Sequence, residues 1–244
     1  MTTPLFVHLR VHSEFSISDG LTRIEELIRI AKADGQGAIA LTDAHNFFGL
    51  IKFYTGARSA GIKPIAGVDV AISNPKDREM PYRLLLLVRD RVGYGQLCEL
   101  LTRGFLENQY RGRPELRSEW LTPESSSGLI VLSGAMAGEV GVALLAGGDG
   151  VAQASALAEK FKGRFFIELQ RCGTEESEFY TQKAAQLAAS LGLPVVATHP
   201  VQFAAAEDFR AHEVRVCISE GEILGNPRRV QRYTVEKKKK TQSQ

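Results

Sequence analysis

The stretch that decides the fold is His8-Leu9-Arg10-Val11-His12-Ser13, which continues to Asp19-Gly20. Its apolar and polar residues alternate, so we predict a first strand of an α/β protein. Side chains two residues apart on a strand point to the same face, which places Arg10 beside His12, and Asp19 follows on the next loop. Imidazole and carboxylate groups at a strand end are typical metal ligands of a metallo-phosphoesterase. Arg10 lies among them, however, and an arginine cannot bind a metal.

Outward from this stretch, short apolar runs alternate with amphipathic segments, which is typical of repeated βα units. The expected strands are Leu5–Val11, Gly37–Thr42, Lys63–Ile72, Tyr82–Val88, Gly128–Leu132, Arg164–Leu169 and Pro194–Thr198. The expected helices are Leu21–Ala33, Phe47–Ala60, Gly93–Asn108, Glu139–Ala146, Val151–Phe161, Glu175–Leu191 and Ala205–Cys217. Their connections are long enough for right-handed crossovers, so we predict a parallel sheet or barrel with its chemistry at the carboxyl ends of the strands.

Composition sets the class of protein. The chain has 244 residues, of which 44% are hydrophobic and 24% charged, and a net charge of +2. This charge is too small to argue for nucleic-acid or membrane binding by itself. Cys98, Cys172 and Cys217 share no metal-binding spacing, and we expect reduced, mostly buried thiols. The absence of a leader or an apolar run of membrane length favours a cytoplasmic protein with no membrane partner.

The sequence gives little support for several other kinds of catalytic or metal-binding site. Ser133 lacks the context of a nucleophile elbow. His212 lies in an expected helix, where a packed or capping histidine is more common than a ligand. Asp-x-Asp, the usual carboxylate pair of nucleotidyl transfer, does not occur. The remaining set lies near strand ends, where imidazoles and carboxylates could hold Zn²⁺ or Mn²⁺ or simply form loop hydrogen bonds: His12, Asp19, Asp43, His45, Asp69 and His199.

The chain resembles the polymerase-and-histidinol-phosphatase (PHP) domain of the bacterial DNA polymerase III alpha subunit. The resemblance runs from residue 4 to about residue 235 and rests on residues 6–16, 19–20, 40–43, 46, 49, 61–69, 132–134, 138–140, 193–198, 208–209 and 211–213. It implies a distorted seven-stranded (βα)7 barrel of TIM-like, PHP type. Residues 1–235 would form this domain, and residues 236–244 a basic or polar tail that is disordered or a fragment end.

Metal-binding members of this family carry nine ligands, and the resemblance assigns each of them a position here. The nine positions are Arg10, His12, Asp19, Ala44, Asp69, Arg83, Ala135, Pro200 and Gln202. Only His12, Asp19 and Asp69 keep a side chain that can bind a metal. His45 and His199 each lie one residue from a lost position and are the other candidates for residual ligands. A zinc site needs about three or four protein ligands in tetrahedral reach, so we expect no metal or cofactor, with weak Zn, Mn or Mg binding as the alternative.

The substitutions also suggest what replaced the metals. Carboxylates left buried without a cation are costly, and a guanidinium can pair with them bidentately. We therefore expect Arg10 and Arg83 to pair with Asp19 and Asp69.

Two functions follow from the resemblance. The first is a non-catalytic scaffold, which implies as partners the remainder of the polymerase alpha subunit, its proofreading exonuclease subunit, and DNA only through the full polymerase. The second is a residual metal-dependent phosphoesterase, either a pyrophosphatase or a 3′–5′ exonuclease, that uses the retained ligands. DNA-directed DNA polymerase activity would belong to a longer parent protein.

Overall fold

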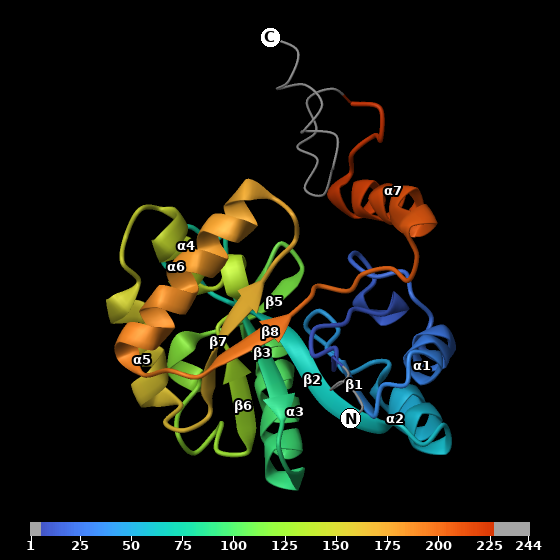
Figure 1. The fold of residues 1–244 in the computed structure, drawn as a ribbon, viewed down its shortest axis with the longest axis horizontal. Helices are drawn as coiled ribbons and strands as arrows, with labels where there is room; N and C mark the ends of the chain where they lie inside the picture. Colours follow the sequence, from blue (N-terminus) through green and yellow to red (C-terminus); the bar gives the residue numbers. More distant parts are fainter. Residues whose placement is uncertain (1–5, 227–244) are drawn as a thin grey trace.

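The chain alternates strands and helices, and the computed structural model describes residues 6–226 (Figure 1). The strands are β1 (Ala38–Leu41), β2 (Lys63–Ile72), β3 (Tyr82–Val88), β4 (Gln109–Tyr110), β5 (Arg113–Leu116), β6 (Leu129–Leu132), β7 (Phe165–Gln170) and β8 (Val195–Thr198). The helices are α1 (Ile24–Ala33), α2 (Leu50–Ser59), α3 (Arg91–Glu107), α4 (Glu139–Leu145), α5 (Val151–Lys160), α6 (Glu175–Leu191) and α7 (Phe209–Glu220). Four 3₁₀ turns are η1 (Glu14–Ser16), η2 (Ser118–Trp120), η3 (Ala135–Ala137) and η4 (Ala206–Asp208). The expected tail 236–244 lies outside the described residues.

Backbone hydrogen bonds join seven segments into a ring. Strands β1, β2, β3, β6, β7 and β8 pair in that order. Residues 8–12 close the gap, because the amide of Thr42 donates to the carbonyl of Val11 (2.9 Å) on one side and the amide of His12 donates to the carbonyl of Val201 (2.8 Å) on the other. The ring is the arrangement expected of a distorted seven-stranded barrel.

The expectation of a strand over Leu5–Val11 is wrong for the described residues. They form an extended segment with a single bridge, from Val11 to Val201. The segment bonds to β1 through His8 and Val11 and to Val201 through Arg10 and His12, so neither side forms a continuous ladder.

The predicted parallel arrangement has one exception in the ring, because β3 runs antiparallel to both β2 and β6. The loop Ser73–Pro81 is too short for a crossover helix, so β2 and β3 form a hairpin. The other pairs of the ring are parallel. As a result, the amino end of β3 lies at the same end of the barrel as the carboxyl ends of its neighbours.

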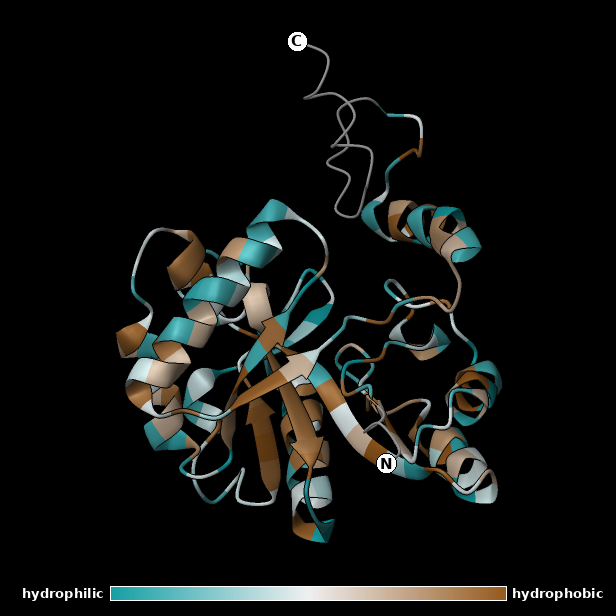
Figure 2. Ribbon diagram, in the orientation of Figure 1, coloured by the Kyte–Doolittle hydropathy of each residue, from teal (hydrophilic) through white to brown (hydrophobic). Residues whose placement is uncertain are grey.

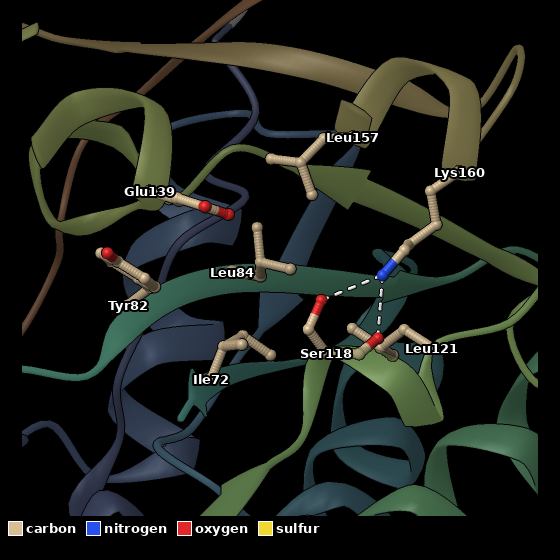
Figure 3. A pocket seen from close by; sticks show the side chains of 8 residues that line it. All are labelled: Ile72, Tyr82, Leu84, Ser118, Leu121, Glu139, Leu157 and Lys160. Atoms are coloured by element: carbon tan, nitrogen blue, oxygen red, sulfur yellow. Dashed lines mark hydrogen bonds between the residues drawn. The ribbon is translucent and has the colours of Figure 1, made fainter. Parts of the chain in front are cut away.

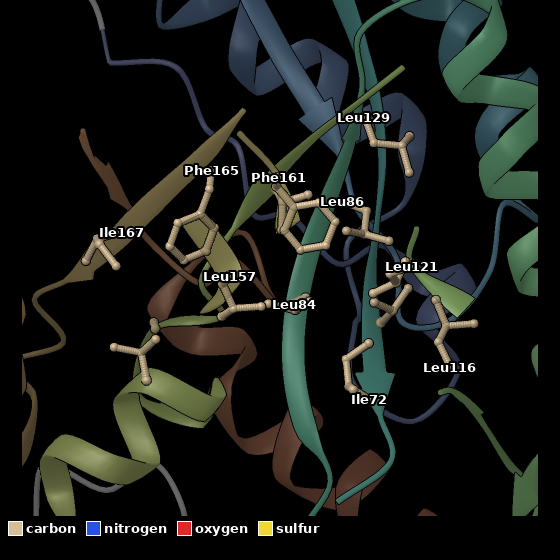
Figure 4. Packing of buried hydrophobic residues seen from close by; sticks show 14 of the residues in the cluster. Ile72, Leu84, Leu86, Leu116, Leu121, Leu129, Leu157, Phe161, Phe165 and Ile167 are labelled. Carbon is tan, nitrogen blue, oxygen red and sulfur yellow. The ribbon is translucent and has the colours of Figure 1, made fainter. Parts of the chain in front are cut away.

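Apolar side chains fill both surfaces of the sheet. In Figure 2, strands β3 and β6 are brown, whereas the helices mix brown and teal residues. Helices α3–α6 pack over β3, β6 and β7, where Leu84, Leu86 and Leu129 meet Phe161 and Phe165 (Figure 4). Helices α1 and α2 cover the β1 side. Inside the ring, Leu85, Leu87 and Leu132 form a smaller apolar layer, and the polar residues described next lie beyond it.

Candidate functional site: a charged network at the barrel mouth

A largely buried cluster of charged and polar residues fills one end of the barrel. We call it the mouth network, and its members are Arg10, His12, Asp19, Asp69, Arg83, Glu168, Gln202 and His212. Arg10 and His12 come from the extended segment, Asp69 from β2, Arg83 from the start of β3, and Glu168 from β7. The antiparallel direction of β3 therefore brings Arg83 to this end.

Arg10 is the centre of the network and is only 7% exposed. Its Nε and Nη2 donate to the two carboxylate oxygens of Glu168, at 2.8 and 3.0 Å, in a bidentate pair. Its Nη1 donates to Asp69 Oδ2. Burial alone would lower the pKa of this guanidinium, but Asp69 and Glu168 raise it above its ordinary value. Arg10 therefore stays charged between two buried carboxylates.

Asp69 receives two further donors. Arg83 Nε donates to its Oδ1 at 3.0 Å, and Arg83 Nη2 lies 3.0 Å from its Oδ2. His12 Nε2 lies 3.2 Å from the same Oδ2. Burial would raise the pKa of Asp69, but Arg10 and Arg83 hold it well below its usual range. The expected arginine pairing is present at Asp69.

Asp19 is paired differently from the expectation, because its hydrogen-bonding partners are histidines and an amide. His12 Nδ1 lies 3.1 Å from its Oδ2, and Gln202 Nε2 donates to its Oδ1 at 2.5 Å. His212 Nε2 lies 3.4 Å from Oδ1. Burial would raise the pKa of Asp19, but hydrogen bonds from His12 and His212 lower it below its usual range. His212, expected to be a packed histidine, is fully buried and belongs to the network.

His12 is held as a cation between two carboxylates. Burial lowers its pKa, but hydrogen bonds to Asp19 and Asp69 outweigh burial and raise it to about 9. At neutral pH both ring nitrogens are then protonated, and a protonated nitrogen has no lone pair for a metal.

Glu168 was not predicted as a site residue, although it is fully buried and fully paired. Besides Arg10, its Oε1 accepts from Thr198 Oγ1 (2.5 Å) and Gln170 Nε2 (3.0 Å). The signal in the sequence is a single carboxylate inside the apolar run Phe165–Leu169, which requires a buried cation.

The remaining predicted positions lie around this network without joining it. His45 is half-buried and has a left-handed backbone, and its Nδ1 accepts from the amide of Ala71 (3.3 Å). Burial and Arg83 lower its pKa to about 3. His199 is exposed. Asp43 accepts hydrogen bonds from Ser13 and Ser16 and so fixes the turn η1. The other three positions have no metal-binding side chain: Ala44, Ala135 and Pro200.

A metal does not fit this donor set. Every carboxylate of the mouth network already accepts from arginine, histidine or amide groups. Among the described residues, no three His, Cys, Asp or Glu side chains are grouped so as to hold a metal ion. The guanidinium of Arg10 lies between two carboxylates, as a divalent cation would in a metal site.

A small pocket lies apart from the mouth network, on the outside of the barrel between β2, β3, η2 and α5. Figure 3 shows the residues that line it. Lys160 Nζ donates there to Ser118 Oγ (2.9 Å) and to the Ser118 carbonyl (2.8 Å). Its volume of about 10 Å³ is roughly that of one water molecule. This pocket is too small for a substrate.

The family of the chain follows from its similarity to known proteins. The family model of the PHP domain matches residues 8–172. The chain belongs to the PHP domain family. It is 47% identical over 238 residues to the DNA polymerase III subunit alpha of Neisseria meningitidis, and 39% identical over 236 residues to that of Escherichia coli K12. Each match covers 96% of this PHP domain but 21% and 20% of the relative, so the chain spans about a fifth of the length of the curated relatives it matches.

Solved structures show the same fold. An amidohydrolase from Chromobacterium violaceum matches with a TM-score of 0.58 and 16% identity, over 86% of this chain and 96% of that one. A metal-dependent phosphoesterase described as putative, from Bifidobacterium adolescentis, matches with a TM-score of 0.58 and 11% identity, over 87% and 97%. At these identities the likeness concerns the fold alone.

Two expectations concern the chain as a whole. Within residues 6–226, no helix is long and apolar enough to span a membrane. The cysteines are free, but the expectation that they are mostly buried holds only for Cys217, because Cys98 is half-buried and Cys172 is exposed.

Proposed function

We propose that this PHP domain is part of a DNA polymerase III alpha subunit and acts there as a non-catalytic scaffold. The single observation that carries the proposal is the Arg10 guanidinium, which bridges Asp69 and Glu168 in the mouth network. A resident cation of this kind neutralises the carboxylates that metals would otherwise bind. The residues at the nine family ligand positions then stabilise the fold rather than bind metals, and catalysis belongs to other parts of the longer subunit.

Metal analysis of the purified chain tests this proposal. We expect less than about 0.1 equivalent of tightly bound Zn²⁺, Mn²⁺ or Mg²⁺ after dialysis, and no increase of the melting temperature when Mn²⁺ is added. A stoichiometric tight metal would overturn the proposal. The variant Arg10→His supplies the control, since it returns one family ligand and removes the resident cation.

A scaffold acts by binding other proteins, and two partners are proposed for this domain. The matches to a fivefold longer polymerase subunit support the remainder of that subunit as one partner, and the family role supports its proofreading exonuclease subunit as another. Mixing the chain with that exonuclease subunit on a sizing column tests the second interaction. Co-elution at micromolar concentration is expected, and separate elution would contradict docking on this domain.

A residual phosphoesterase is the second candidate, and the observation that favours it is that His12 contacts both Asp19 and Asp69. Phosphate release from pyrophosphate or a 3′-terminal nucleotide in the presence of Mn²⁺, lost in His12→Ala, would support it. We expect no phosphate release above the His12→Ala background, because His12 is protonated and Asp69 already accepts hydrogen bonds from Arg10 and Arg83.

A further inference from the structure

The outer face of β8 differs from that of every other strand in the ring. We call this face the β8 flank and define it by Val195 and Ala197. Val196 packs into the inner apolar layer and Thr198 bonds to Glu168 inside the barrel. Side chains alternate along a strand, so Val195 and Ala197 point outward. Val195 is 50% exposed and Ala197 is exposed, whereas the outward Phe165 and Ile167 on neighbouring β7 are 3% and 0% exposed.

The helix that should cover this flank lies elsewhere. In a βα barrel, the helix after a strand packs beside that strand. Helix α7 follows β8 but is held over the mouth, where Arg215 Nη2 donates to the carbonyl of Glu14 (3.3 Å) and His212 contacts Asp19. Figure 1 shows β8 facing the viewer with α6 on one side and α1 on the other. No helix within residues 6–226 lies on the flank between them.

Within residues 6–226, the edge of β8 that faces away from β7 forms no strand ladder, although residues 8–12 close the ring just beyond it. The residues of β8 pair with β7 on one side, while on the other side the first bridge among the described residues is at Val201, beyond the strand. An apolar strand whose outer face is exposed favours coverage by another segment.

We infer that a helix from the part of the longer polymerase subunit that follows this domain packs its apolar face on the β8 flank. The inference rests on the proposed membership of such a subunit. The chain spans about a fifth of its relatives, so the continuing chain can supply the helix that α7 does not. The helix fills the position between α6 and α1 and completes the outer layer of the barrel.

Thiol labelling of a hybrid protein tests this inference. Residues 1–226 replace the matching region of the Neisseria meningitidis subunit, and Ala197→Cys reports on the flank. Ser155→Cys, on the exposed side of α5, is the matched control. Modification by N-ethylmaleimide is measured at each position by peptide mass spectrometry, in the hybrid and in the 244-residue chain. We expect the ratio of the rates at 197 and 155 to be at least fivefold lower in the hybrid.

A smaller fall in this ratio overturns the inference, and Val195→Cys repeats the measurement if Ala197→Cys does not fold. Protection that appears only when the exonuclease subunit is added overturns it in favour of a separate partner. Concentration-dependent protection in the 244-residue chain overturns it in favour of a second copy. DNA synthesis by the hybrid is a separate readout: its absence contradicts the proposed function, whereas the labelling ratio still decides whether the flank is covered.

Discussion

The interior of this barrel has two halves that are filled by opposite means. Towards one end, Leu85, Leu87 and Leu132 form an apolar layer. Towards the mouth, Arg10, Asp69 and Glu168 occupy the same kind of space with charges. Apolar packing needs only volume and shape, and tolerates substitutions that keep both. The mouth network needs each charge to keep its partner, because an unpaired buried charge is costly. The four predictions that follow test this difference.

The largest effect is expected from Arg10→Met, which keeps much of the side-chain volume but leaves Asp69 and Glu168 without their shared cation. We expect the free energy of unfolding, measured by urea denaturation, to fall by about 3–5 kcal/mol. The double variant Arg10→Met/Glu168→Gln removes one of the unpaired charges and should recover part of the loss. A single variant as stable as the wild type would show that the network does not stabilise the fold.

In the apolar layer, Leu85→Ala should cost about 3 kcal/mol through lost burial and a residual cavity. Leu85→Met, which conserves volume, should cost less than about 1.5 kcal/mol. The same denaturation measurement applies. A Leu85→Met variant as unstable as Leu85→Ala would remove the distinction between volume and pairing.

Raising the pH should destabilise the mouth network but not the apolar layer. The pKa of His12 is raised to about 9 from an ordinary 6.5, so its contribution is complete below about pH 6.5 and is lost as the pH rises through 9. The shift corresponds to roughly 3 kcal/mol at most. We expect unfolding free energies measured from pH 6.5 to 9.5 to fall in the wild type and in Leu85→Ala, and to fall much less in His12→Gln. Equal slopes in all three would contradict a charged His12.

Arg83→Lys should give the smallest effect, a loss of about 1 kcal/mol or less. Arg83 is nearer the surface than Arg10, with a side chain 23% exposed, and solvent screens its pairing with Asp69. A lysine keeps the charge but not the fork that contacts both oxygens of Asp69. Urea denaturation of Arg83→Lys and Arg10→Met at the same pH compares their unfolding free energies. A larger loss in Arg83→Lys would mean that Arg83 stabilises the fold more than Arg10 does.

Much of this architecture could be predicted from the sequence. Strands β2 and β3 and helix α6 have the expected bounds, because turn residues or charge changes delimit their apolar patterns. The two-residue strand β4 and the strand β5 were missed, since Arg113–Leu116 has no apolar alternation and its pairing with β2 depends on tertiary contact.

The site was predictable in part. Arg10 and His12 were expected together from strand spacing, and Asp69 from its place near a strand end. Arg83 was added by its position in the family resemblance alone. Glu168 was not expected, since it lies inside an apolar strand rather than at a strand end. The pairing of Asp19 with His212 was not expected either, because those residues are 193 positions apart and meet only after α7 folds over the mouth.

The bidentate contact between Arg10 and Glu168 also constrains how such a domain can change over generations. A histidine at position 10 would leave the carboxylate at 168 uncompensated, and a neutral residue at 168 would leave the arginine with one carboxylate fewer. Either single replacement is expected to lower the stability of the fold, whereas both residues can be exchanged together. Positions 10 and 168, 158 residues apart, are therefore expected to be inherited as a unit among related polymerase subunits.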